Sequence, residues 1–135
     1  MTLQFSVACR NAMLDTLESV PGTGAIMTIR SGAAPANCAA ANSGTVLATL
    51  TLPSDWMAAA SGGVKSKSGT WQDTSADATG TAAHFRIHDS AGTTCHHQGT
   101  VTATGGGGDL TVDSVSFTSG QQFTVTQYDL TAPNA

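Results

Sequence analysis

The chain has 135 residues, enough for one domain with a modest core and too few for two. Only 10% of its residues are charged, against about 25% in an average protein, and 21 Thr and 21 Ala take up most of the difference. The net charge is −4, and the chain has no basic stripe of the kind that a protein needs to bind nucleic-acid phosphates. No apolar run reaches the roughly 18 residues of a membrane-spanning helix. Such a neutral surface is typical of a protein that packs against another protein.

The N-terminal sequence and the cysteines indicate a chain made and kept inside a cell. Residues 1–5 have neither the basic segment nor the apolar segment of a secretory signal. Cys9, Cys38 and Cys95 are odd in number, and their spacings fit no disulfide framework. We therefore expect reduced thiols.

The first part of the chain predicts an amphipathic helix over residues 6–19, which Ser6 can cap and Pro21 can end. One face is apolar, with residues at three- and four-residue steps: Phe5, Ala8, Cys9, Ala12, Met13 and Leu17. The other side is polar, with Arg10, Asn11, Asp15 and Glu18. We expect residues 1–22 to form an N-terminal helix, which either packs on its own domain or docks as an arm on a neighbouring subunit. Residues 23–135 are expected to form a single β domain.

From residue 24 onward the apolar pattern has a period of two, which is typical of strands. About seven strands are expected, over residues 25–30, 46–52, 68–73, 83–88, 95–102, 110–118 and 121–130. The last two runs each slip phase once, and a β-bulge in each would restore the alternation. The pattern predicts a mainly β fold, an antiparallel β-sandwich or jelly-roll-like barrel, and leaves the strand order open.

Two long connections, residues 31–44 and 53–69, are candidates for contact with a partner. The second is expected to contain a short helix over residues 54–60, capped by Ser54, followed by a flexible stretch. The glycine run at residues 105–108 lacks the Lys-Ser/Thr of a phosphate-binding loop and is interpreted as a strand connection.

Four histidines that lie close together in the sequence allow a zinc site to be drawn, with Cys95 and Asp89 nearby. The histidines are His84, His88, His96 and His97. On a strand, His84 and His88 would stand roughly 13 Å apart, too far to bind one ion together. We predict that these histidines are polar positions on the solvent face, and a zinc-dependent enzyme is kept as an alternative.

Nothing else in the sequence points to catalysis. The chain has no G-x-S-x-G motif, its one Glu lies on the predicted helix, and its Asp residues mostly lie at predicted turns. We therefore assign no catalytic, cofactor-binding or metal-binding residue and no cofactor, and we expect that the protein is not an enzyme.

Three aromatic residues, Trp56, Trp71 and Tyr128, could form the sugar-stacking platform of a carbohydrate-binding module. A domain of this size needs most of its aromatic residues inside, so core burial is predicted for Trp71, Phe85, Phe117 and Phe123. Trp56 lies in a long connection, where it is expected to anchor the loop.

Residues 32–63 (GAAPANCAAANSGTVLATLTLPSDWMAAASGG), residues 80–113 (GTAAHFRIHDSAGTTCHHQGTVTATGGGGDLTVD) and the opening LQFSVACRNAMLD carry a resemblance. They resemble small, mostly uncharacterised virion structural proteins of tailed bacteriophages, and no catalytic motif comes with the likeness. The resemblance implies a non-enzymatic structural protein of the virion, made in the bacterial host cytoplasm.

Within that class we expect a capsid decoration (cement) protein that stabilises contacts between capsid subunits. Its partner would be the major capsid protein, and it would form a homo-oligomer, for which a trimer suits local threefold sites. No nucleic acid and no membrane are expected as partners. The alternatives are a tail or head–tail connector component, and a carbohydrate-binding β-sandwich module displayed on the virion.

Overall fold

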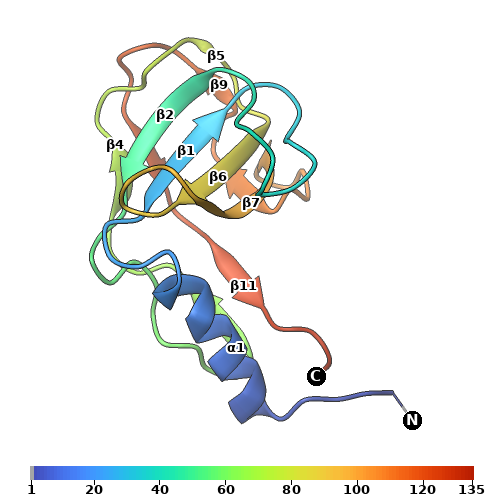
Figure 1. The fold of residues 1–135 in the computed structure, drawn as a ribbon. Helices are drawn as coiled ribbons and strands as arrows, with labels where there is room; N and C mark the ends of the chain where they lie inside the picture. Colours follow the sequence, from blue (N-terminus) through green and yellow to red (C-terminus); the bar gives the residue numbers. More distant parts are fainter. Residues whose placement is uncertain (1) are drawn as a thin grey trace.

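The computed structural model describes residues 2–135, and within them the fold is mainly β with one α-helix, α1 (Val7–Ser19). The mainly β prediction is confirmed, because a curled sheet closes with shorter strand pairs into a barrel-like body (Figure 1). The strands of the described residues are β1 (Ile26–Arg30), β2 (Val46–Thr51), β3 (Val64–Ser66), β4 (Trp71–Asp73), β5 (Gly80–Thr81), β6 (His84–His88), β7 (Cys95–Ala103), β8 (Leu110–Val112), β9 (Ser116–Phe117), β10 (Phe123–Val125) and β11 (Asp129–Thr131).

The main sheet has five strands in the order β2-β1-β6-β7-β8. Its first three pairings are antiparallel, but β7 and β8 run parallel, with Val101 opposite Leu110. The expectation of a purely antiparallel fold is therefore wrong at this edge. The glycine run makes the parallel pairing possible, because a Cβ at Gly106 or Gly108 would stand only 2.7–2.8 Å from the side chain of Thr102.

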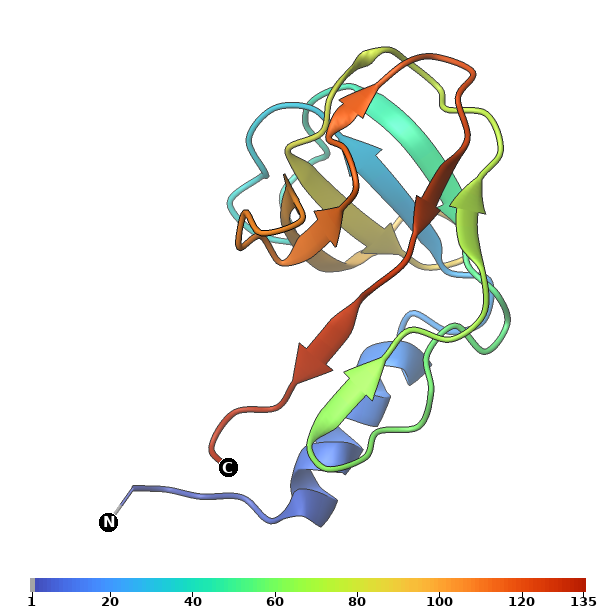
Figure 2. The same ribbon diagram turned by 180° about the vertical axis from the view of Figure 1, so that it is seen from behind.

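The remaining strands form three antiparallel pairs, β10–β4, β5–β9 and β11–β3. Seen from behind, β10 and β4 lie across the barrel from the main sheet (Figure 2). Between them lies one apolar cluster, which includes Met27, Ile29, Trp56, Trp71, Phe85, Ile87, Phe117, Phe123 and Tyr128. Burial of Trp71, Phe85, Phe117 and Phe123 was predicted and is confirmed.

Two predicted strands are divided in the structure. Residues 110–118 form β8 and β9, and residues 121–130 form β10 and β11, and the two halves of each run belong to different sheets. The phase slips in the sequence therefore mark breaks between strands, and the bulges expected there are wrong. Register shifts occur instead between Ile29 and Arg30 and between Ile87 and His88.

The prediction of a short helix over residues 54–60 is wrong, because the structure has a turn and extended backbone there. The buried side chains of Trp56 and Met57 hold the segment against the core, and Met57 bridges to Lys67. The amide of Ala58 donates to the carbonyl oxygen of Ser66 at 2.8 Å. The segment therefore runs alongside β3, and all of β3 lies within the stretch that was predicted to be flexible, so that prediction is wrong.

Helix α1 lies beside β3 and β11 on one side of the barrel, together with both ends of the chain (Figures 1 and 2). We call α1, β3 and β11 the helix module. The Oγ of Ser6 accepts the amide of Cys9 at 3.2 Å, which confirms the predicted cap. The amide of Phe5 donates to the carbonyl oxygen of Asn134 at 2.8 Å and so joins the two ends.

Candidate functional site

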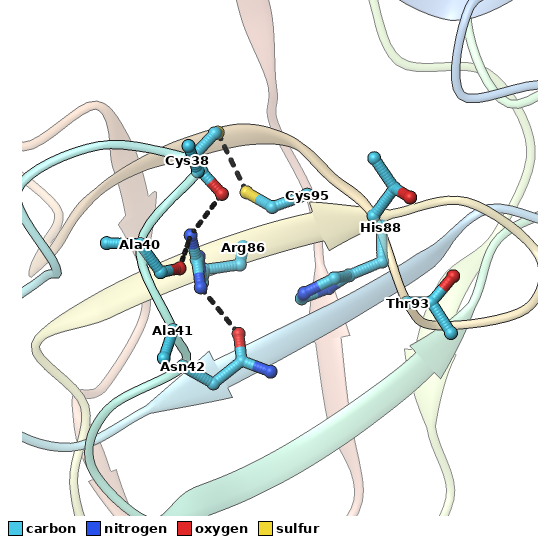
Figure 3. Close-up of a pocket in the computed structure, with 10 residues that line it drawn as sticks. Cys38, Ala40, Ala41, Asn42, Arg86, His88, Thr93 and Cys95 are labelled. Carbon is cyan, nitrogen blue, oxygen red and sulfur yellow. Dashed lines mark hydrogen bonds between the residues drawn. The ribbon is translucent and has the colours of Figure 1, made fainter.

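The connection between β1 and β2, residues 31–44, lies over the outer face of the main sheet, and we call it the strap (Figure 3). Its ends are closed by Ser31, whose amide donates to the carbonyl oxygen of Thr45 and whose hydroxyl accepts the Thr45 amide, both at 3.0 Å. Glycine and alanine make up much of the strap, so its backbone can approach the sheet closely. Carbonyl groups of the strap therefore reach side chains of β6 and β7.

Arg86, in the middle of β6, holds the strap in place. Its side chain is only 1% exposed. The guanidinium donates to Oδ1 of Asn42 at 2.6 Å. It also donates to three backbone carbonyl oxygens at 2.9–3.2 Å, those of Asn37, Cys38 and Ala40. A buried charge is tolerated when it is hydrogen-bonded, and here the strap supplies the acceptors.

Two neighbours of Arg86 extend this contact. Nδ1 of His84 lies 2.8 Å from the carbonyl oxygen of Gly32, and Nε2 of Gln98 donates to the carbonyl oxygen of Pro35 at 2.8 Å. His84 and His88 are 0% and 4% exposed, so the prediction that they face solvent is wrong. Strand alternation gave the correct side of the sheet, but it carries no signal that a distant connection covers that side.

Beside Arg86 the strap leaves a cleft of about 550 Å³ (Figure 3). Strap residues 38–42 form one wall, and the other lining residues are Arg86, His88, Thr93, Thr94 and Cys95. Burial, and then the nearby charges of Arg86 and Arg30, lower the pKa of His88. Its imidazole is therefore neutral at pH 7 and can donate or accept a hydrogen bond.

Two thiols meet at the edge of this cleft. The Sγ atoms of Cys38, in the strap, and Cys95, at the start of β7, lie 2.7 Å apart (Figure 3). Burial, followed by the contact with Cys38, raises the pKa of Cys95 to about 11. Cys9 is exposed on α1, and all three cysteines are free thiols in the structure. The sequence gave no signal for this meeting because 57 residues separate the two positions.

The histidines considered for zinc lie on both faces of the sheet. His84 and His88 face the strap, whereas Nδ1 of His97 lies 2.9 Å from the hydroxyl of Tyr128 and the ring packs against Trp56. The carboxylate of Asp89 accepts the backbone amides of its own turn. Among residues 2–135, no group of three His, Cys, Asp or Glu side chains could hold a metal ion.

The aromatic residues considered for sugar stacking are buried. Trp56 and Trp71 are 0% exposed and Tyr128 is 4% exposed, so none of the three presents a ring face to solvent. Nε1 of Trp56 donates to the carbonyl oxygen of Gly22 at 3.1 Å, and its ring lies 5.7 Å from that of Trp71. The prediction that Trp56 anchors its loop is confirmed. The alternative in which Trp56, Trp71 and Tyr128 form a sugar-stacking platform is wrong.

Helix α1 packs on the rest of the chain through its polar side. Nζ of Lys65, on β3, lies 2.8 Å from Asp15 and 3.2 Å from Glu18, and the lysine is 2% exposed. Burial lowers the pKa of Lys65, but the hydrogen bonds that its ammonium donates to both carboxylates outweigh this effect and raise the pKa. Arg10 donates to the carbonyl oxygen of Ala132, and Asn11 accepts the amide of Gly63.

The apolar side of α1 consequently faces solvent. Its exposed residues include Ala8, Cys9, Ala12, Met13 and Leu17, and the C-cap residue Val20 is exposed as well; we call these six residues the outer helix face. The periodicity gave this stripe correctly, but it could not tell which side of the helix contacts the chain. Of the six exposed large apolar side chains within residues 2–135, five lie between Leu3 and Val20. Beside Leu17 a hollow of about 350 Å³ continues this surface, lined also by His96, His97, Tyr128 and Leu130.

No family model, curated protein or solved structure matches the chain. In the part of the chain that the structure describes, no helix is both long enough and apolar enough to cross a membrane.

Proposed function

We propose that the chain is a non-enzymatic structural protein of a tailed phage particle, a capsid decoration protein that docks on the major capsid protein through the outer helix face. The observation that carries this proposal is the orientation of α1. Its polar side is used within the chain, and its apolar side is left free. A contiguous exposed apolar surface on a small protein marks a site of interaction with another protein.

The spacing on the outer helix face suits docking into a groove. Met13, Leu17 and Val20 follow one another at steps of four and three residues, the pattern of anchors by which a helix binds a groove. The hollow beside Leu17 adds a concave element, into which an apolar side chain of the partner can insert. Together they form a surface with one protruding and one recessed part.

The helix is already ordered before any partner binds. The ion pairs of Lys65 with Asp15 and Glu18 fix α1 to β3. A preformed surface loses less conformational entropy on binding than a flexible arm would. Repetition over a capsid lattice then allows a modest contact to give stable attachment, because many copies act together.

The placement in the particle is tested by counting. Quantitative mass spectrometry of purified particles of the phage that encodes this chain should give a copy number equal to that of the major capsid protein or to a simple fraction of it. A handful of copies would contradict a decoration protein and favour a tail or connector component. Absence of the chain from the particle would overturn the virion proposal.

The docking surface is tested by Met13→Glu. Met13 is 43% exposed, so the variant should fold with little loss of stability, while its binding to particles stripped of the chain should weaken at least about tenfold, because a charge would be buried against the partner. Ser119→Glu is the matched control, since it adds the same charge at an exposed residue of the barrel. Equal binding of both variants and the unmodified chain would contradict docking through the outer helix face.

A further inference from the structure

Cys38 and Cys95 are the two thiols in the structure whose sulfur atoms touch. The separation of 2.7 Å between their Sγ atoms is less than 1 Å above the disulfide bond length of about 2.05 Å. Sγ of Cys95 also lies 3.2 Å from the carbonyl oxygen of His97, which holds the thiol near the start of β7. A covalent bond between the two sulfurs thus needs only a small movement.

The backbone on each side of this contact is held independently. On the strap side, Arg86 donates to the carbonyl oxygens of Asn37, Cys38 and Ala40. On the sheet side, Cys95 pairs with His88 at the bulge between β6 and β7. Because both cysteines are positioned by other contacts, their meeting does not depend on the thiols themselves.

The contact is accessible to small reagents. Cys38 and Cys95 both line the cleft of about 550 Å³, and each is partly exposed. A small disulfide such as oxidised glutathione can react with a thiol at the edge of this cleft. Because the two sulfur atoms are 2.7 Å apart, an intramolecular bond is favoured over cross-linking between chains.

We propose that Cys38 and Cys95 form a reversible disulfide that locks the strap onto the main sheet. The oxidant is a low-molecular-weight disulfide. One of the two thiols loses its proton and attacks the small disulfide, forming a mixed disulfide and releasing one small thiolate. The other sulfur then attacks the mixed disulfide, giving up its proton as it does so, and displaces the second small thiolate; the released thiolates take up the two protons. The protein loses two protons and two electrons, and the small disulfide is reduced to two thiols.

Burial and the contact with Cys38 raise the pKa of Cys95 to about 11, so oxidation should become faster as the pH rises. The disulfide does not depend on the proposed function. In a phage particle it would form after release from the reducing cytoplasm.

The full chain in the Cys9→Ser background provides the test. After incubation with oxidised glutathione and removal of the excess, alkylation under denaturing conditions should modify neither remaining cysteine, and peptide mapping should link Cys38 to Cys95. The reduced sample should be alkylated at both. Two reactive thiols after oxidation, or recovery of glutathione adducts alone, would overturn the proposal.

The locking effect is measured on the same chain without a further substitution. Closing a loop between positions 57 residues apart should raise the melting temperature of the oxidised form on the order of 10 °C above that of the reduced form. Cys38→Ser in the Cys9→Ser background should abolish this difference. Identical melting of the oxidised and reduced forms would show that the bond does not lock the strap.

Discussion

Arg86 is the residue of the main sheet that makes the most hydrogen bonds to the strap. Its guanidinium is buried, and four acceptors of the strap surround it. The strap has few large apolar side chains of its own, so hydrogen bonds to Arg86 replace the packing that normally fixes a loop. Together with the bonds of His84 and Gln98 to the strap, these contacts position the cleft and bring Cys38 to Cys95.

Replacement of Arg86 by Lys should therefore be costly although it keeps the charge. A lysine ammonium has three donors on one atom and cannot reproduce the planar fork that reaches Asn42 and three carbonyl groups. We expect Arg86→Lys to lower the free energy of unfolding by about 3 kcal/mol, measured by urea denaturation.

Arg30→Lys is the matched control for this variant. Arg30 lies on the same face of the sheet and is also buried, but its Nε donates only to Oγ1 of Thr28, at 3.0 Å. Its replacement should cost clearly less. If the two lysine variants lose the same stability, the role assigned to the Arg86 hydrogen bonds is wrong.

At the scale of elements, the strap needs glycine at both ends, for different reasons. Gly32 and Gly44 both have positive φ, of +76° and +71°. A Cβ at Gly32 would meet nothing within 4 Å, whereas a Cβ at Gly44 would collide with the carbonyl oxygen of Ser31. That oxygen belongs to the backbone and cannot rotate away as a side chain would.

The two alanine variants separate backbone strain from the collision. Gly32→Ala should cost about 1–2 kcal/mol, the penalty for an L-residue in the left-handed region. Gly44→Ala should cost at least about 2 kcal/mol more, because the closed end of the strap must open. Thermal unfolding followed by circular dichroism measures both. Equal losses would mean that the backbone around Ser31 adjusts freely.

The helix and strands differ in how far the sequence could predict them. Local signals were sufficient for α1, its Ser6 cap and the strands β1, β2, β6 and β7, because periodicity and capping depend on neighbouring residues. They were insufficient for the strap over His84 and His88 and for the short strand β3. Those features depend on contacts between distant segments, such as Arg86 with Asn42. The outer helix face was visible as an apolar stripe, but its exposure depends on Lys65, far along the chain.

At the scale of the whole molecule, two parts are held together by different forces. The barrel encloses one apolar cluster, with Trp71 and Phe85 among its buried members. Leu14 of the helix module and Ala132, which directly follows β11, are buried outside that cluster, and around them the contacts are mostly polar. Regions with fewer buried apolar contacts open at lower free energy than the rest of a protein. The helix module should thus open before the barrel unfolds.

Lys65→Met tests this division. The variant removes the cation shared by Asp15 and Glu18 but keeps a side chain of similar length in the buried position. Asp15 is 50% exposed, so the loss should lie below the 3–5 kcal/mol typical of a fully buried pair, at about 2 kcal/mol for opening of the helix module. Native-state hydrogen exchange should show faster exchange in α1, while amides of β1 and β6 keep their protection.

Lys67→Met is the matched control, because Nζ of Lys67 donates to the carbonyl oxygen of Gly69 and takes no part in holding α1. It should leave exchange in α1 unchanged. If Lys65→Met accelerates exchange in α1 and in the central strands by the same factor, the two parts unfold as one unit. The outer helix face would then be as stable as the barrel, and the ion pairs of Lys65 would stabilise the whole molecule rather than the helix module alone.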